Sequence, residues 1–167
     1  QGKLALDDEL GQYVPEFPVG ERTVTIEQLL QHTSGINCYT GVGDAWWKVL
    51  PLELTHDELL ALVEDAPFVF EPGSNWGYSN TGYYLLGMVI EKITGGSYAE
   101  AVQAELCGPL GLARTRYDSS RERIKNRAQG YALDGDQLVN DQILGMSQPG
   151  AAGGILSTAG DLVRWQM

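Results

Sequence analysis

The chain has 167 residues, of which 43% are hydrophobic and 20% are charged, so it is long enough to bury one sizeable core. Its formal net charge of -11 argues against nucleic acid or an anionic membrane as a partner. No apolar run reaches the roughly 18 residues that a membrane-spanning helix needs. Cys38 and Cys107 form no C-x-x-C pair, and His32 and His56 are too few for a histidine-based metal site.

The first half of the chain predicts short helices with apolar faces. Asp7 is a candidate cap for a helix that ends before Pro15, because the residue before proline disfavours helical backbone. Capping boxes of the form S/T-x-x-E/Q at residues 25–28 and 55–58 predict two further helix starts. Between them, adjacent tryptophans at 46–47 point to different faces of a short helical stretch, so at most one is expected in the core.

A loop followed by a long apolar helix dominates the middle of the chain. Pro72-Gly73 is a turn pair, and either Ser79 or Asn80 can cap the helix that follows. Apolar residues then recur at helical spacing until Gly95-Gly96, where the helix is expected to end. A third capping box at residues 97–100 opens an amphipathic helix that is expected to run through Leu106.

The last third of the chain predicts the only β structure. Residues 128–133 and 137–139 have the composition of two short strands, and Asp134-Gly135 between them is typical of a hairpin turn. Residues 148–154 form a loop of small side chains that lets the backbone approach closely. Thr158 with Asp161 caps a final helix. The fold class is therefore mainly α (α+β), with one short β-hairpin.

The two histidines have different settings in the sequence. His32 follows a predicted helix and could act as a base, but a lone histidine beside a helix end is more often structural, and we interpret it so. His56 lies in the first turn of a predicted helix, and we expect it to be solvated.

Several stretches occur together in an order that resembles the serine β-lactamase and DD-peptidase superfamily, in the branch with class C β-lactamases, D-alanyl-D-alanine carboxypeptidases and related esterases. The resemblance covers essentially the whole chain, and the combination is far more specific than any single stretch. The stretches are Gly2-Lys3-Leu4-Ala5-Leu6-Asp7-Asp8, Tyr13-Val14-Pro15-Glu16-Phe17-Pro18, residues 26–35 ending in His32-Thr33-Ser34-Gly35, Pro72-Gly73 through Tyr78-Ser79-Asn80, and residues 152–158.

The resemblance implies a serine acyl-transfer enzyme that uses three motifs. The nucleophile lies in an S-x-x-K helix, the second motif is Tyr-x-Asn, and the third is a K-T-G or H-x-G strand. Tyr78 and Asn80 match the second motif. By this resemblance Tyr78 shares the general acid/base work, and Asn80 orients the lysine and binds the substrate. A tyrosine has a pKa of about 10, so it serves as a base near neutral pH only where nearby cations, the motif lysines in this family, favour its phenolate.

The chain departs from the family pattern at the other two motifs. No serine is followed three residues later by lysine; Ser119 and Ser120, for example, are followed at that spacing by Glu122 and Arg123. No K-T-G or H-x-G follows Ala152. We therefore expect residues 1–167 to be a single-domain fragment of the β-lactamase/transpeptidase-like fold. It would keep the helical region and lack the nucleophile helix and most of the central antiparallel sheet.

The expected function is that of a serine hydrolase acting on amide, β-lactam or ester bonds, with this chain inactive alone. The alternatives are a non-catalytic penicillin-binding-protein-like binding or sensor module, and an unrelated helical interaction domain. The expected substrate is a small molecule or a peptidoglycan-like peptide, with no nucleic acid partner, no metal and no organic cofactor. Loss of the sheet would uncover an apolar face, so we also expect a homodimer. The resemblance favours an extracytoplasmic location, but the residues themselves do not decide it.

Overall fold

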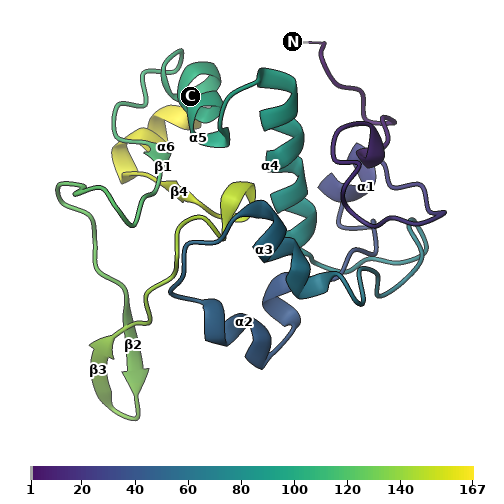
Figure 1. Cartoon of the computed structure of the whole chain (residues 1–167). Coiled ribbons are helices and arrows are strands. Elements are labelled where there is room, and N and C mark those ends of the chain that lie inside the picture. Colours follow the sequence, from purple (N-terminus) through teal and green to yellow (C-terminus); the bar gives the residue numbers. More distant parts are fainter. Residues whose placement is uncertain (1) are drawn as a thin grey trace.

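The computed structural model describes residues 2–167, and its organising element is the helix α4 (Asn80–Thr94). In Figure 1 this helix stands upright through the middle of the molecule, with the N-terminal segment and α1 on one side and α5, α6, β1 and β4 on the other. The helices α2 and α3 lie near the end of α4 at which the helix begins. The other α-helices are α1 (Ile26–Leu30), α2 (Asp44–Val49), α3 (His56–Leu60), α5 (Tyr98–Val102) and α6 (Ala159–Trp165).

The capping residues that the sequence predicts are present. Thr25, Thr55 and Ser97 each accept a hydrogen bond from the backbone N–H three residues on, and each box is closed by the reciprocal side-chain contact. Thr158 caps α6 by accepting from the Asp161 N–H. Of the two candidates for α4, Ser79 is the cap, accepting from the Gly82 N–H. The helix starts were therefore predictable from local side-chain chemistry.

The main core surrounds α4. Its buried face packs against α1, α3 and the N-terminal segment, and Leu85 and Val89 have no exposed surface. Of the paired tryptophans, Trp46 packs against this core, whereas the side chain of Trp47 is 54% exposed. The remaining buried apolar members of this cluster are Leu10, Val14, Phe17, Val24, Ile26, Leu29, Ile36, Tyr39, Leu59, Leu60, Val63, Tyr84, Leu86 and Met88.

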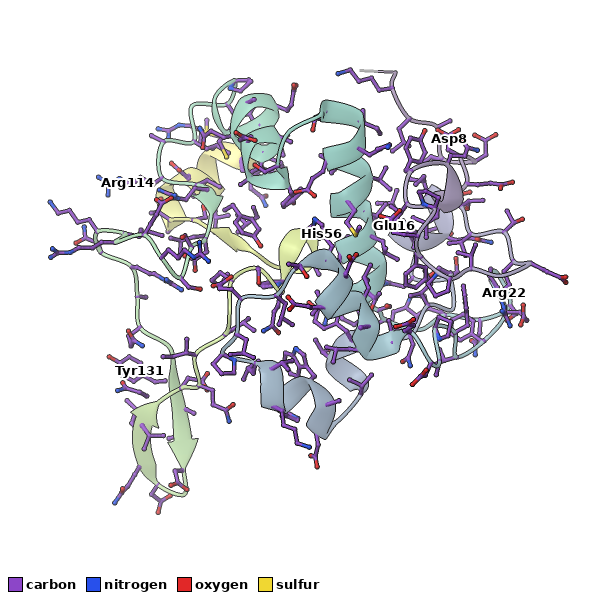
Figure 2. All side chains as sticks on the ribbon, viewed as in Figure 1. Asp8, Glu16, Arg22, His56, Arg114 and Tyr131 are labelled. Atoms are coloured by element: carbon purple, nitrogen blue, oxygen red, sulfur yellow. The ribbon has the colours of Figure 1, made fainter. Side chains whose placement is uncertain are left out.

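The predicted β-hairpin is present with shifted bounds. It comprises β2 (Tyr131–Asp134) and β3 (Gln137–Asn140), antiparallel, with Leu133 opposite Leu138. Because Asp134 pairs with Gln137, the turn consists of Gly135-Asp136, and Gly135 has the positive φ of 60° that such a turn requires. Figure 2 shows Tyr131 on this hairpin, which extends away from the helices.

Three sequence predictions require correction. Asp7 caps no α-helix, because the N-terminal segment forms only a 3-10 helix at Leu10–Gln12 with Glu9 as its N-cap residue. The helix that opens at residue 97 does not continue as an α-helix through Leu106, because it passes into a π-helix at Gln103–Cys107. The chain also has a second antiparallel pair, β1 (Arg116–Tyr117) with β4 (Ile155–Leu156). Two-residue strands have no detectable periodicity, and this pairing joins segments far apart in sequence.

None of the helices within residues 2–167 combines the length and the apolar composition that a helix needs to cross a lipid bilayer.

Candidate active site

The Tyr78-Ser79-Asn80 stretch lies where a loop enters α4. Ser79 is nearly fully buried, and its Oγ accepts the Gly82 N–H at 3.2 Å, which satisfies one of the unpaired donors of the first helical turn. Tyr78 precedes this cap and is 57% exposed, and Asn80 is the first helical residue. The buried cap therefore anchors two flanking side chains, of which Tyr78 is accessible to a ligand.

The two side chains predicted to be catalytic are in direct contact. The Tyr78 hydroxyl donates to Asn80 Oδ1 at 2.7 Å. Asn80 Nδ2 in turn donates to Thr40 Oγ1 at 3.1 Å, and the Asn80 backbone N–H donates to Cys38 Sγ at 3.3 Å. Cys38 Sγ and Thr40 Oγ1 lie 3.0 Å apart. Both functional groups of the Asn80 side chain are thus engaged, which sets the orientation of its amide.

His32 supports Tyr78 from the other side. The two rings lie 4.6 Å apart between centroids, and His32 also packs on Tyr83 at 4.9 Å. His32 Nδ1 accepts the Ser79 backbone N–H at 3.2 Å. Burial lowers the pKa of the His32 imidazole, which favours the neutral form that this hydrogen bond requires. These contacts agree with the structural interpretation of His32, since the ring positions the loop that carries Tyr78.

Backbone hydrogen bonds hold the Tyr78 loop against the segment that contains His32. The Gly77 N–H donates to the His32 carbonyl at 2.9 Å, and the Gly73 N–H donates to the Thr33 carbonyl at 2.8 Å. His32 has a φ of 58°, a left-handed conformation that is uncommon outside glycine and turns the chain sharply at this point. Two stretches separated by about forty residues in sequence therefore form one unit.

The sequence identified Tyr78 and Asn80 but not the side chains that hold Asn80. Thr40 and Cys38 lie in a short segment before α2 whose composition gives no functional signal. Their proximity to Asn80 depends on how that segment folds against the start of α4, so spacing alone could not reveal it.

His56 lies at the surface and contacts two side chains of α4. Its ring is about half exposed, but it does not simply face solvent: Nδ1 lies 2.7 Å from the Tyr84 hydroxyl, and Nε2 lies 3.0 Å from Glu91 Oε2. The predicted exposure of His56 is confirmed, and the structure adds two contacts that the sequence did not indicate. Within residues 2–167, no cluster of three or more histidine, cysteine, aspartate or glutamate side chains is arranged to hold a metal ion.

The site geometry can now be compared with known proteins. A sequence model described as Beta-lactamase matches residues 1–167, and the chain therefore belongs to this family. Penicillin-binding protein 4* of Bacillus subtilis (strain 168) is 38% identical over 138 residues, which cover 80% of this chain and 30% of that protein. The chain thus spans about a third of the length of this curated relative.

Solved structures show the same fold. A D-stereospecific amidohydrolase from Streptomyces sp. superposes with a TM-score of 0.84 at 31% identity, over 99% of this chain and 53% of that one. An octameric penicillin-binding protein homologue from Pyrococcus abyssi gives a TM-score of 0.77 at 34% identity, over 99% of this chain and 39% of that one. The expected β-lactamase and penicillin-binding-protein fold is confirmed.

Proposed function

We propose that this chain is the part of a serine acyl-transfer hydrolase that carries the Tyr-x-Asn motif. The observation that carries the proposal is the 2.7 Å hydrogen bond between the Tyr78 hydroxyl and Asn80 Oδ1 at the mouth of α4, in a chain of the Beta-lactamase family. The substrates would be amides, β-lactams or esters, cleaved through an acyl-serine intermediate.

In the proposed mechanism Tyr78 and Asn80 have separate roles. As a phenolate, the form that the motif lysines would favour, Tyr78 would take the proton of the attacking serine; as the resulting phenol it would return that proton to the leaving group. Asn80 holds the phenol at a defined position through Oδ1, and its amide is the candidate contact for a substrate carbonyl or the motif lysine. The serine nucleophile and its lysine would come from an S-x-x-K motif, and the third motif would be K-T-G or H-x-G; residues 1–167 contain none of these.

The test uses the full-length natural gene product and a fluorescent penicillin. We expect a covalent adduct, and we expect Tyr78→Phe to slow its formation by about 10²–10⁴-fold, the usual contribution of a positioned general acid/base. Tyr131→Phe is the matched control, because it removes the same hydroxyl group from an exposed tyrosine on the hairpin. It should leave the acylation rate unchanged. Acylation is followed by gel fluorescence and intact mass.

The chain of 167 residues alone provides the complementary measurement. Because it has no S-x-x-K, we expect no mass adduct after incubation with the penicillin or a p-nitrophenyl ester. A stable adduct on any of its serines would contradict the proposed division of roles. Failure of the full-length protein to be acylated would instead favour the second candidate, a penicillin-binding-protein-like binding or sensor module, which the absence of S-x-x-K in this chain also fits.

We also propose that the isolated chain forms a homodimer through exposed apolar surface. Leu162, Val163 and Trp165 of α6 are each more than half exposed, and such surface promotes association. Light scattering should show an apparent molar mass that increases with protein concentration, and Leu162→Asp should suppress this rise. Leu138→Asp, at a leucine of β3 that is even more exposed than Leu162, is the control and should not suppress the rise. A monomeric mass at the highest concentration would argue against the proposal.

A further inference from the structure

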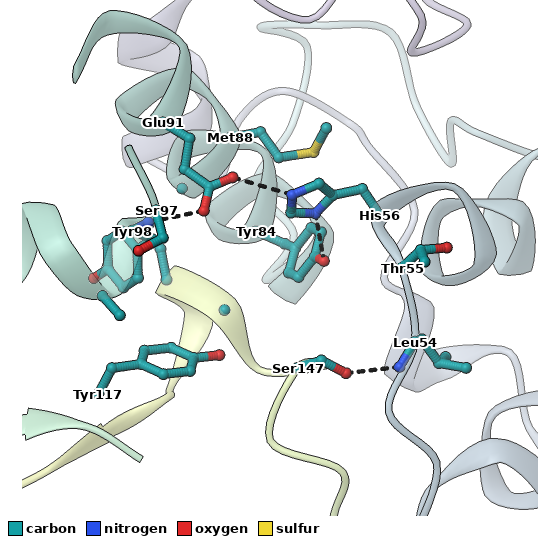
Figure 3. Close-up of a pocket in the computed structure, with 14 residues that line it drawn as sticks. Leu54, Thr55, His56, Tyr84, Met88, Glu91, Ser97, Tyr98, Tyr117 and Ser147 are labelled. Carbon is teal, nitrogen blue, oxygen red and sulfur yellow. Dashed lines mark hydrogen bonds and ion pairs between the residues drawn. The ribbon is translucent and has the colours of Figure 1, made fainter. Parts of the chain in front are cut away.

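A cavity of about 370 Å³ lies on the side of α4 that faces α5 and the segment before α3. It is lined by α3, α4, α5, β1 and the segment around residues 147–151, and Figure 3 shows its side chains. Neither Tyr78, Asn80 nor His32 lines it. The volume is that of a small-molecule site, and the cavity is distinct from the proposed catalytic centre.

One carboxylate at this cavity is held in a fixed orientation. Glu91 Oε1 accepts the Tyr98 backbone N–H at 2.8 Å, and Glu91 Oε2 lies 3.0 Å from His56 Nε2. His56 is itself oriented by the Tyr84 hydroxyl, 2.7 Å from Nδ1. Because a carboxylate oxygen has two lone pairs, each oxygen of Glu91 can accept a further donor. Glu91 is therefore preorganised as an acceptor.

Aromatic rings form the walls. Tyr98 and Tyr117 meet edge to face with centroids 6.0 Å apart, and Tyr84 packs edge to face on the His56 ring at 5.5 Å. The hydroxyl of Tyr117 donates to the Met146 carbonyl, and that of Tyr84 is engaged by His56. With these hydroxyls occupied, the rings offer mainly π-surface and apolar edges to a ligand.

Among the described residues that line the cavity, Glu91 is the one carboxylate, and His56 contacts it. Burial raises the pKa of Tyr117 to about 12, and the nearby Glu53 and Glu91 carboxylates act in the same direction. No lysine or arginine is among the described residues that line the cavity. A cation would gain from both Glu91 and the ring faces, whereas an anion would be repelled.

We propose that this cavity binds an organic ammonium ion: a primary amine in its cationic form, carried on an apolar body of about the size of a phenyl ring. The ammonium group donates to Glu91, and the apolar body packs among Tyr84, Tyr98 and Tyr117. An ammonium has three donors, of which two can fill the one remaining acceptor position on each oxygen of the oriented carboxylate. The assignment is independent of the proposed acyl-transfer activity, because it uses none of the same side chains.

Binding is tested with three probes of similar shape and different charge: phenethylammonium, 2-phenylethanol and 3-phenylpropanoate. The readout is ¹H–¹⁵N NMR of the 167-residue chain, in which the Tyr98 amide reports directly because its N–H bonds Glu91. We expect saturable shifts at Tyr98 with phenethylammonium, binding at least about tenfold weaker for the alcohol, and none for the carboxylate. Equal affinity for the alcohol, or shifts centred away from α4 and α5, would overturn the proposal.

Single substitutions test separately how much the charge of Glu91 and the shape of the aromatic wall contribute to binding. Glu91→Gln keeps an oxygen for the Tyr98 N–H but removes the charge, and it should weaken phenethylammonium at least about tenfold. Glu64→Gln, at an exposed carboxylate outside the cavity, is the matched control and should bind as the unmodified chain does. Tyr98→Leu tests the aromatic wall by a second route, and thermal unfolding checks that each variant is folded. Unchanged affinity in Glu91→Gln, or no binding by the unmodified chain at about 10 mM probe, would refute the site.

Discussion

At the scale of single residues, the position of Tyr78 depends on His32, which contacts it and has a structural role. The His32 ring packs against the Tyr78 ring, and its Nδ1 accepts the N–H of the adjoining Ser79 at 3.2 Å. A protonated imidazole could not accept this bond. The protonation state of His32 is therefore coupled to the position of the Tyr78 loop.

This coupling predicts a pH dependence of stability. Burial lowers the pKa of His32 below its ordinary value of 6.5, so the unfolded chain binds a proton at a higher pH than the native chain does. The stabilisation is fully present above about pH 6.5 and is lost as the pH falls below it. Urea unfolding measured between pH 7 and pH 5 should show this decline. The groups that face the His32 ring are Trp76, Tyr78 and Tyr83.

The variant His32→Asn isolates the effect. Asparagine tolerates the positive φ and still offers a side-chain oxygen to the Ser79 N–H, but it does not titrate. We expect a smaller decline with falling pH than in the unmodified chain. In His56→Asn the contribution of His32 should persist. An unaltered pH slope in His32→Asn would show that another group is responsible.

At the scale of elements, the loop that carries Tyr78 is held by a close backbone approach at Gly35. The Val69 N–H donates to the Gly35 carbonyl at 2.8 Å, and Ile36 forms an isolated bridge with Phe68. Gly35 has a φ of 73°, and a Cβ placed there would overlap the carbonyl oxygen of Phe70. Only glycine satisfies both conditions, so this residue fixes the separation of the two loops.

A pair of glycine substitutions distinguishes backbone strain from steric overlap. Gly95, which ends α4, has the same φ of 73°, but a Cβ there would meet nothing within 4 Å. Gly95→Ala should lower the unfolding free energy by about 1–2 kcal/mol, the cost of the left-handed conformation. Gly35→Ala should cost at least about 2 kcal/mol more, because backbone must also move. Chemical denaturation measures both, and equal losses would show that the overlap relaxes freely.

At the scale of the whole molecule, Gln148 connects the C-terminal third to the segment around α2. Its side chain is completely buried, and Nε2 lies within 2.7–3.0 Å of the Val49, Leu50 and Leu52 carbonyls. Oε1 accepts the Trp46 indole N–H at 3.0 Å. One amide thus joins the C-terminal third to three carbonyls at and just beyond the end of α2 and to the Trp46 indole, in addition to the backbone donors that Val49 and Leu50 already have.

Removal of this amide is expected to be costly. Gln148→Leu keeps the approximate volume but leaves the Trp46 indole N–H and the Leu52 carbonyl without this partner, while the Val49 and Leu50 carbonyls keep only their backbone donors. The unfolding free energy should therefore fall by about 3 kcal/mol. Gln142→Leu, at an exposed glutamine in the same segment, is the control and should stay within about 0.5 kcal/mol. Urea denaturation of both variants gives the comparison. A similar small effect for the two would contradict the assigned role of Gln148.

The features that the sequence predicted correctly are local. Capping boxes at Thr25, Thr55 and Ser97 need only residues three positions apart, and the apolar spacing of α4 needs only the helical period. The Tyr-x-Asn pair was assigned through the family resemblance, and the catalytic role of its two members stays a prediction. For the N-cap of α4, the sequence offered two adjacent candidates, Ser79 and Asn80, and the structure shows that Ser79 is the cap.

What the sequence could not reveal are contacts between distant segments. Thr40 reaches Asn80, Gln148 reaches Trp46, and Glu91 reaches His56 only because the core brings their elements together. Such contacts leave no periodic signal in one chain, since their sequence separation is set by connecting loops and not by a helical or strand repeat. The amino-acid sequence by itself therefore determined the capped helices and the hairpin, because both depend on residues close together in the chain. Only the tertiary structure decided what holds Tyr78 and Asn80 in place, and that a cavity lined by Glu91 and tyrosine rings exists beside α4.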